Sequence, residues 1–148
     1  MVEVVSNSPL ETEAFAEKLG KVLSGGEVVC YYGGLGMGKT RFTAGLARGM
    51  DIEEDVHSPT FAIVHEYSGN KTLYHFDMYR ITSFDDLCST GFFDYMDGCS
   101  VLAVEWTENI EGALPEDKII RIEIQRGETD EQRILRMSGD SVYENSWY

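Results

Sequence analysis

The eight residues GGLGMGKT, at positions 33–40, follow directly on the apolar run VVCYY at Val28–Tyr32. They satisfy the pattern G-x-x-x-x-G-K-[S/T] in full. β-branched and aromatic residues that end at glycines favour a buried strand before the loop, and residues 39–50 are predicted to form a helix after it. This order of strand, loop and helix is the context that a phosphate-binding loop requires.

The residue types of the loop match the chemistry of a nucleotide phosphate. Glycines let successive backbone N–H groups point into one cavity, because no Cβ stands in the way. Lys39 supplies a positive charge for the β and γ oxygens, and Thr40 supplies a hydroxyl for Mg²⁺. The dipole of the following helix adds to the attraction. We therefore expect ATP and Mg²⁺ to bind at residues 33–40, beginning at Gly33; the alternative, a chance glycine-rich turn, does not explain the flanking strand and helix.

The rest of the chain predicts a mixed sheet with helices around it. Ser8, Pro9 and Glu11 are typical of a helix start. The apolar residues after them recur at helical spacing and are expected to face the core: Leu10, Phe15, Leu19, Val22 and Leu23. Further strands are predicted at residues 61–67, 72–76, 101–104, 120–124 and 132–137, with a hairpin turn at 68–71 and a short, irregular helix within 83–96. The predicted fold class is α/β, a single P-loop NTPase-like domain over residues 1–148.

Composition limits the possible functions. The 26 acidic and 12 basic residues give a net charge of −14, which disfavours strong direct binding to nucleic acid. Three cysteines without CxxC spacing suggest neither a disulfide framework nor a zinc site, and they suit a reducing cytoplasm. Nothing approaches the roughly 18 apolar residues of a membrane span. Five basic residues fall in the last third, where a solvated hairpin face is favoured over a binding patch: Lys118, Arg121, Arg126, Arg133 and Arg136.

Two carboxylates are candidates for the chemistry beside the loop. Glu105 follows the apolar run at residues 101–104, and an acid at the carboxyl end of such a strand can reach Mg²⁺ or its water shell. Asp77 also follows a predicted strand. It can position the attacking water or join the outer shell of the metal, but a salt bridge with Arg80 that fixes a turn explains it equally well.

The segment 58–61 and Trp106 each allow a functional and a structural interpretation. The loop SPTF at residues 58–61 suits a switch that senses the γ-phosphate, and it equally suits a rigid proline at the start of a strand. Trp106 lies beside the nucleotide or fills the core. The histidines at positions 57, 65 and 75 lack the i, i+4 spacing of a metal pair and are predicted to be structural.

Four motifs together resemble the bacterial TsaE family: GGLGMGKT at 33–40, SPTF at 58–61, HFDMYR at 75–80 and VEW at 104–106. The likeness covers about residues 9–137, in the order and approximate spacing of the family. It implies a small P-loop ATPase that works with the TsaB and TsaD proteins. Together these proteins make the threonylcarbamoyl-adenosine next to the anticodon of ANN-decoding tRNAs.

The resemblance also assigns roles to individual residues. It makes Asp77, Glu105 and Lys39 catalytic, gives Thr40 and Glu105 to Mg²⁺, and makes the segment 58–61 switch-like. It gives the following residues to ATP: Leu35, Gly36, Met37, Gly38, Lys39 and Thr40. Two positions depart from the family pattern, which often has proline at position 107, here Thr107, and a Leu-Gly pair where residues 87–91 read LCSTG. The partner surface around residues 84–95 is therefore left open.

The expected mechanism follows from charge. Phosphoryl transfer to water needs neutralised charge and an aligned nucleophile, and Lys39, Mg²⁺ and the loop amides supply only the first. Slow turnover is expected until TsaB and TsaD complete the site, with hydrolysis resetting the complex and the tRNA held chiefly by the partners. A small-molecule kinase and a nucleotide-regulated binding module are the alternatives, although no basic lid segment is visible in the sequence.

Overall fold

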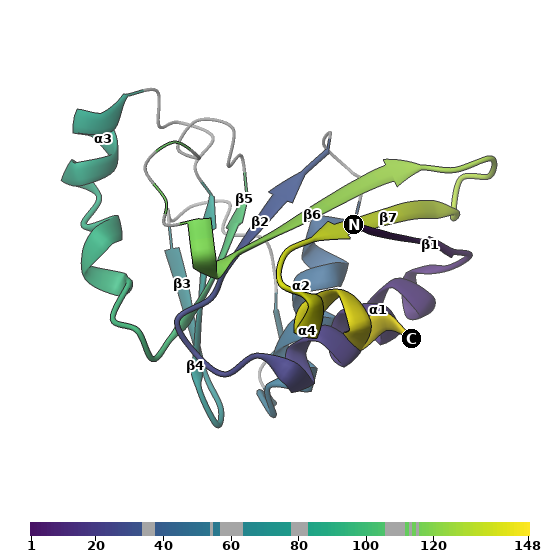
Figure 1. Cartoon of the computed structure of the whole chain (residues 1–148), viewed down its shortest axis with the longest axis horizontal. Coiled ribbons are helices and arrows are strands. Elements are labelled where there is room, and N and C mark those ends of the chain that lie inside the picture. Colours follow the sequence, from purple (N-terminus) through teal and green to yellow (C-terminus); the bar gives the residue numbers. More distant parts are fainter. Residues whose placement is uncertain are drawn as a thin grey trace.

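The structure is a computed structural model of the chain, and it describes residues 1–33, 38–53, 55–56, 64–77, 83–105, 112, 114 and 116–148. Within these residues seven strands form one sheet, in the order β1-β7-β6-β2-β5-β4-β3 (Figure 1). The strands are β1 Val2–Ser6, β2 Val28–Tyr32, β3 Val64–Ser68, β4 Thr72–Asp77, β5 Val101–Glu105, β6 Ile119–Arg126 and β7 Arg133–Ser138. The helices are α1 Pro9–Val22, α2 Lys39–Gly49, α3 Phe84–Ser89 and α4 Ser141–Glu144, with the 3₁₀ turns η1 Phe92–Tyr95, η4 Glu116–Lys118 and η5 Asn145–Trp147.

The four central strands, β6, β2, β5 and β4, run parallel to one another. The outer strands β3, β7 and β1 pair antiparallel, and Ser68 lies opposite Thr72 at the β3–β4 hairpin. Strands β2 and β5 are almost entirely apolar because their side chains are buried in the cores on both faces of the sheet. The predicted α/β fold with a mixed central sheet is confirmed.

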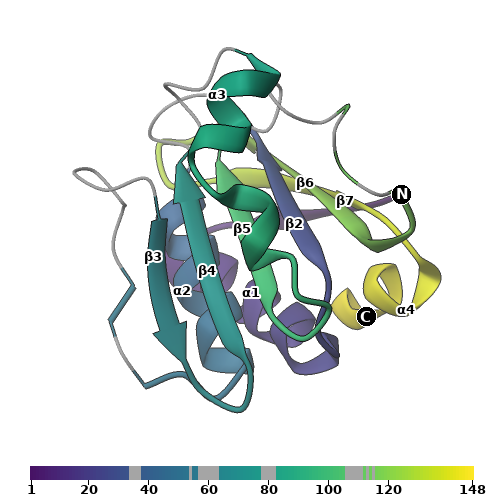
Figure 2. The ribbon, with the colours of Figure 1, turned by 90° about the vertical axis from the view of Figure 1, so that its left-hand side faces the viewer.

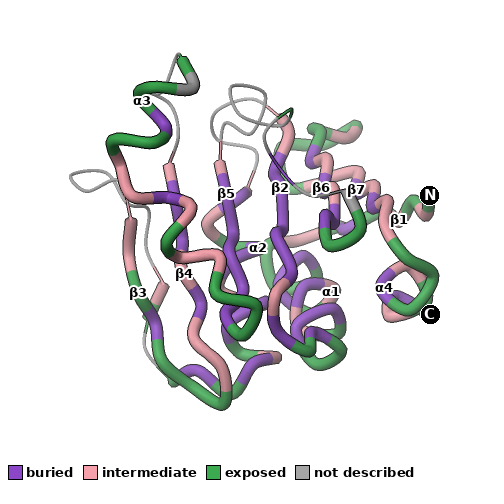
Figure 3. The backbone as a smooth tube through the Cα atoms, turned by 60° about the vertical axis from the view of Figure 1, so that its left-hand side comes forward, coloured by how far each residue is buried: buried purple, intermediate pink, exposed green. Residues whose placement is uncertain are grey.

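Helices lie on both faces of the sheet. Helices α1, α2 and α4 cover one face, and α3 with η1 covers the β4–β5 part of the other (Figures 1 and 2). Each face has its own apolar core, one built around Tyr31, Phe42 and Leu46 and the other around Phe76 and Phe92. Burial is deepest along β2 and β5 (Figure 3). No described helix is long and apolar enough to cross a bilayer.

Helix α1 starts as predicted but presents a different face to the core. Its cap is Ser8, whose Oγ accepts a hydrogen bond from the Glu11 N–H at 3.2 Å. The prediction for two apolar positions was wrong, because Leu10 is 72% exposed and Val22 is 36% exposed. The buried residues of the helix are Thr12, Glu13, Ala16, Leu19 and Gly20. This mostly small and polar set faces helix α2, so the contact does not follow the apolar periodicity.

Glycines bring the backbones of α1 and α2 into direct contact. A Cβ added at Gly45 would lie 2.2 Å from the Glu13 carbonyl oxygen, and one at Gly20 would lie 2.3 Å from that of Leu46. The Glu13 carboxylate then bridges to α2 through Arg41 at 3.5 Å and Arg48 at 3.4 Å. Because α2 carries the end of the phosphate-binding sequence, this contact fixes where that end lies.

The elements at the two ends of the chain were not predicted from the sequence. Strand β1 adds to the sheet beside β7, and its valines Val2 and Val4 pack against the core. At the other end Trp147 is 3% exposed and contacts the rings of Phe15 and Phe42, with centroids 5.8 and 6.4 Å apart. Both segments are short, so neither shows enough periods of a pattern to be predicted.

A buried carboxylate attaches the C-terminal helix to the amino end of β2. Glu27 is fully buried and accepts hydrogen bonds from the backbone N–H groups of Ser24 and Gly25, at 2.9 and 2.7 Å. It also accepts one from the Tyr143 hydroxyl of α4 at 2.9 Å. Burial alone would raise the pKa of Glu27, but the hydrogen bonds from Ser24, Tyr143 and Gly25 together hold it below its usual value of 4.5.

The first prediction concerns the α1–α2 contact. At a solvent-exposed position inside a helix, replacing glycine with alanine raises the free energy of unfolding by about 1 kcal/mol. At Gly45 the new methyl group meets the Glu13 backbone, so we expect Gly45→Ala to lower the free energy of unfolding by about 1–3 kcal/mol, measured by denaturant titration. Gly112→Ala is the control, since no described atom lies within 4 Å of its Cβ position. A gain in stability for Gly45→Ala would contradict the contact.

The second prediction concerns Glu27 and pH. The folded-state pKa of this carboxyl is lowered, so its contribution to stability is present above about pH 4.5 and disappears as the pH falls through the folded-state value. Tyr143→Phe removes one hydrogen bond to the carboxylate, and we expect it to lower the free energy of unfolding by about 1.5–3 kcal/mol at pH 7. The difference from wild type should shrink below pH 4.5. Tyr148→Phe, at an 82% exposed tyrosine, is the control, and a loss independent of pH would refute the assignment.

Candidate nucleotide-binding site

The parallel strands bring the candidate residues to one edge of the sheet. β2 ends at Tyr32 and leads into Gly33, while β4 and β5 end at Asp77 and Glu105. Asp77 and Glu105 are register partners on neighbouring strands, and β5 lies directly beside β2. The two carboxylates predicted from separate parts of the sequence therefore end adjacent strands next to the start of the glycine sequence.

The described glycines of the loop adopt conformations that favour glycine. Gly33 has φ 129°, and a Cβ there would lie 2.4 Å from the Ile124 carbonyl oxygen of β6. Gly38 has φ 105° and caps the start of α2. Both values lie in the region that other residues rarely adopt. Leu35, Gly36 and Met37, also predicted to bind ATP, lie outside the described residues.

Helix α2 begins at the end of the loop with the two residues that carry its polar chemistry. Lys39 is its first residue and is 7% exposed, and Thr40 follows, half-buried. The first N–H groups of a helix have no partner within the helix and carry its partial positive charge. The start of α2 therefore suits an anion bound beside Gly38, Lys39 and Thr40.

A chain of buried hydroxyl groups fastens α2 to β2. The Thr43 hydroxyl donates to the Lys39 carbonyl oxygen at 2.9 Å, so the Tyr31 hydroxyl, 2.7 Å from Thr43 Oγ1, donates to Thr43. Tyr31 and Thr43 are both fully buried. Burial, more than any neighbouring charge, raises the pKa of the Tyr31 hydroxyl, so the group remains a donor. The first turn of α2 is thus tied to the strand that precedes the loop.

Glu105 has a partner that sequence reasoning missed. Its side chain is 12% exposed, and Oε2 lies 2.7 Å from Nε2 of the fully buried His75. The sequence predicts a structural role for His75, because it lacks the spacing of a metal pair. Alternation along a strand was the available signal, because it puts His75 on the same face of β4 as Asp77, two residues later. Tyr31 shares this side of the sheet, where the negative charge of Glu105 adds to the rise in its pKa.

The described residues fit a magnesium ion that depends on phosphate for part of its coordination. Adjacent strands lie about 4.8 Å apart, so the ends of Asp77 and Glu105 place two negative charges close together and favour a cation. No group of three or more histidines, cysteines or acids gathers among the described residues. Mg²⁺ often takes only one or two carboxylates and completes its shell with water and substrate phosphate.

Several other predicted residues lie outside the described part of the chain. They are the switch-like residues Ser58, Pro59, Thr60 and Phe61, together with His57, Arg80, Trp106 and Thr107. Because Arg80 is among them, the alternative salt bridge between Asp77 and Arg80 stays a prediction. The surface at residues 83–95, by contrast, is described as α3 and η1, which matches the predicted short helix with an irregular end.

Comparison with known proteins places the chain among its relatives. The family model described as "Threonylcarbamoyl adenosine biosynthesis protein TsaE" matches residues 6–135. The chain belongs to the TsaE family. The tRNA threonylcarbamoyladenosine biosynthesis protein TsaE of Treponema pallidum is 40% identical over 112 residues, which cover 76% of this chain and 83% of the relative. The protein of the same name from Bacillus subtilis is 39% identical over 138 residues, covering 93% and 85%.

A solved structure supports the same conclusion. The crystal structure of Bacillus subtilis YdiB matches this TsaE-family chain with a TM-score of 0.77 and 33% sequence identity, covering 98% of this chain and 90% of the other. The family resemblance seen in the sequence is confirmed, and with it a role in the biosynthesis of threonylcarbamoyladenosine in tRNA. Nucleotide binding is consistent with this fold.

A cavity adjoins the start of α2 in this TsaE-family chain. Its volume is about 230 Å³, and it lies between the first turns of α1 and α2 and the turn that joins β6 to β7. Gly38 and Arg41 contribute from the α2 side. Pro9 and Thr12 contribute from α1, Asp130 and Glu131 from the turn, and Arg133 from the start of β7. The cavity therefore opens beside the residues that end the phosphate-binding sequence.

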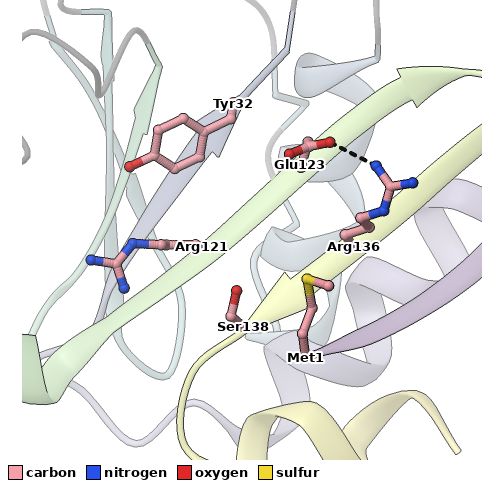
Figure 4. Close-up of a pocket in the computed structure, with 6 residues that line it drawn as sticks. All are labelled: Met1, Tyr32, Arg121, Glu123, Arg136 and Ser138. Atoms are coloured by element: carbon pink, nitrogen blue, oxygen red, sulfur yellow. Dashed lines mark hydrogen bonds and ion pairs between the residues drawn. The ribbon is translucent and has the colours of Figure 1, made fainter.

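A second pocket, of about 310 Å³, lies on the face of β6 and β7 away from α1 and α2, around Tyr32, Arg121 and Ser138 (Figure 4). Its Arg136 donates to Glu123 Oε1 at 2.8 Å and to Glu3 Oε2 at 2.6 Å. The positive charge of Arg136 is thus balanced by two carboxylates. For Arg136, this arrangement agrees with the expectation of a solvated hairpin face rather than a binding patch.

The third prediction tests the hydroxyl chain under the loop. Thr43→Val removes both hydrogen bonds at nearly unchanged volume, and we expect it to lower the free energy of unfolding by about 1–3 kcal/mol. Thr43→Ser keeps the hydroxyl and is the control. If the Tyr31 hydroxyl donates to Thr43, Tyr31→Phe and Thr43→Val combined should cost less than the sum of the single changes in denaturant titrations. Strict additivity would rule out the coupling.

Proposed function

We propose that this chain is a single-domain, ATP-binding protein that hydrolyses ATP slowly on its own and faster in a complex with TsaB and TsaD. ATP hydrolysis resets that complex during threonylcarbamoyl-adenosine formation and does not make the modified base itself. The family membership supports the pathway. The net charge of −14 supports a tRNA held chiefly by the partners, as does the pairing of Arg136 with two carboxylates.

One observation favours an ATPase over a protein that binds the nucleotide without hydrolysing it. Asp77 and Glu105 are register partners at the carboxyl ends of β4 and β5, beside the strand that leads into the phosphate-binding sequence. A protein that only bound a nucleotide would need the loop and one metal-binding group. The second carboxylate is what a hydrolytic site adds, because attacking water must be oriented as well as the charge neutralised.

The residues divide the chemistry between them. Lys39 and the N–H groups at the start of α2 hold the phosphates, with the positive charge of Lys39 directed to the β and γ oxygens. Thr40 and Glu105 would hold Mg²⁺, which would supply further positive charge against the negative charge of the transferred phosphoryl group. Asp77 accepts a hydrogen bond from the attacking water and orients it. The cavity that Gly38, Arg41 and the β6–β7 turn line supports the proposal that the nucleoside lies there, because it adjoins the start of α2.

Lys39 is the cation that begins α2, and the next cation along the helix, Arg41, lies 3.5 Å from Glu13 and is engaged by it. This supports a slow reaction in the isolated protein. Docking on TsaB and TsaD is proposed to order the segment at residues 58–61 and complete the site. The small-molecule kinase and the binding module without turnover remain as alternatives that the same experiment separates.

The test mixes the purified protein with the TsaB and TsaD pair and measures complex formation and phosphate release together, with and without ATP. We expect phosphate release to rise when both partners are present and to stay low with either one alone. Equal rates with and without the partners would overturn the partner-dependent site. Phosphate transfer to a small acceptor, with none released to water, would favour the kinase.

The fourth prediction concerns Asp77. Asp77→Asn keeps the shape of the side chain but weakens it as a hydrogen-bond acceptor for water, so we expect ATP hydrolysis by the complex to fall about 100-fold or more. ATP binding, followed by the fluorescence of a labelled nucleotide, should persist. Asp117→Asn is the control, because Asp117 is exposed at the amino end of β6, on the opposite edge of the sheet. Unchanged hydrolysis in Asp77→Asn would favour the binding module.

A further inference from the structure

The imidazole ring of His75 is buried at a position where an apolar side chain would be expected. It is fully buried on β4, on the same face as Leu73, and its register partner on β5 is Ala103. Burying a polar ring without hydrogen bonds is unfavourable, and an apolar side chain would pack here without that penalty. His75 Nδ1 has no hydrogen-bond partner among the described residues. The ring therefore gains its polar interaction through its other nitrogen.

That other nitrogen contacts the Glu105 side chain. His75 Nε2 lies 2.7 Å from Glu105 Oε2, and a carboxylate oxygen accepts hydrogen bonds, so Nε2 carries the proton and donates. The contact is diagonal, because His75 is opposite Ala103 and Glu105 lies two residues further along β5. The methyl side chain of Ala103 leaves room for it. The tautomer of His75 and the direction of Glu105 are thus set by one bond.

We propose that His75 is a positioning residue: its Nε2–H fixes the Glu105 carboxylate through Oε2 and leaves Oε1 for the metal. This inference rests on the proposed role of Glu105 in the preceding subsection. A glutamate side chain has several rotatable bonds, and ordering it before the ligand arrives removes part of the entropy loss on binding. Groups that hold a metal-binding carboxylate in place typically change metal affinity or activity 10–100-fold when removed.

A merely structural histidine predicts a different outcome. If the His75–Glu105 bond served only to satisfy a buried ring, an apolar replacement would leave the function of Glu105 intact. The neighbouring strand offers a matched comparison in His65, the register partner of His75 on β3. His65 contacts the Tyr67 ring and hydroxyl, and its side chain is half-buried. It shares strand position and residue type with His75 but lies one strand further from Glu105.

The variants are His75→Leu, which removes the donor, and His75→Gln, whose amide N–H reaches a similar place. His65→Leu is the control. For each, we would measure the Mg²⁺ concentration that gives half-maximal nucleotide binding, and nucleotide binding without Mg²⁺. We expect His75→Leu to raise the Mg²⁺ requirement about 10–100-fold and His75→Gln to recover most of the loss. Binding without Mg²⁺, and the Mg²⁺ requirement of His65→Leu, should match wild type.

A measurement on the metal-free protein tests the hydrogen bond itself. The imidazole ¹H–¹⁵N spectrum should contain a slowly exchanging Nε2–H signal from His75, and Glu105→Gln should shift it. This spectrum tests the hydrogen bond even if His75→Leu fails to fold, because it is recorded on the wild-type protein and on Glu105→Gln. An unchanged Mg²⁺ requirement in folded His75→Leu would overturn the inference, as would a His75→Gln variant that is no better than His75→Leu, or a spectrum without the protected signal.

Glu105→Gln separates the proposed role of Glu105 from its positioning by His75. If Glu105→Gln leaves the Mg²⁺ requirement unchanged, then Glu105 does not serve the metal, and the proposed function loses that residue together with the inference. If Glu105→Gln raises the requirement and His75→Leu does not, the role of Glu105 stands and the positioning by His75 is refuted.

Discussion

The parallel pairing of β2, β4 and β5 is the constraint on which the candidate site depends. Parallel strands place all their carboxyl ends at one edge of the sheet, so Tyr32, Asp77 and Glu105 end together although long stretches of sequence separate them. The pairing requires both faces of these strands to be covered, which explains why β2 and β5 are almost entirely apolar. The polar chemistry is left to the first residues beyond the buried runs.

Two contacts fix the helix that completes the site. The glycines of the α1–α2 contact allow the backbones to meet, and the hydrogen bonds from Tyr31 through Thr43 to the Lys39 carbonyl hold the first turn of α2 against β2. The helix can therefore neither slide along the sheet nor rotate without losing buried contacts. Gly33 begins the phosphate-binding sequence and Gly38 precedes the two residues that end it, and both glycines are held in place before a nucleotide is present.

The sequence was a good guide where the signal is local. Residues that alternate along a strand, the glycine spacing of the loop and the cap at Ser8 are all set by near neighbours, and the structure reproduces the strands and the helix start they predict. The buried face of α1 could not be predicted in this way, because the close approach of α2 selects small residues and leaves Leu10 exposed. The His75–Glu105 contact depends on strand order, which periodicity does not reveal.

A buried hydrogen bond ties each end of β2 to a helix. At its amino end Glu27 ties the strand to the C-terminal helix through Tyr143, and at its carboxyl end Tyr31 ties it to α2 through Thr43. The middle of the strand has only apolar side chains. A hydrogen bond inside a protein has strict geometry, whereas apolar contacts tolerate small shifts, so polar ties at both ends determine the position of the strand along its axis. That position sets the distance between Gly33 and the carboxylates of the neighbouring strands. The same reasoning applies to His75, whose single hydrogen bond restricts Glu105 where an apolar neighbour would leave it free to rotate.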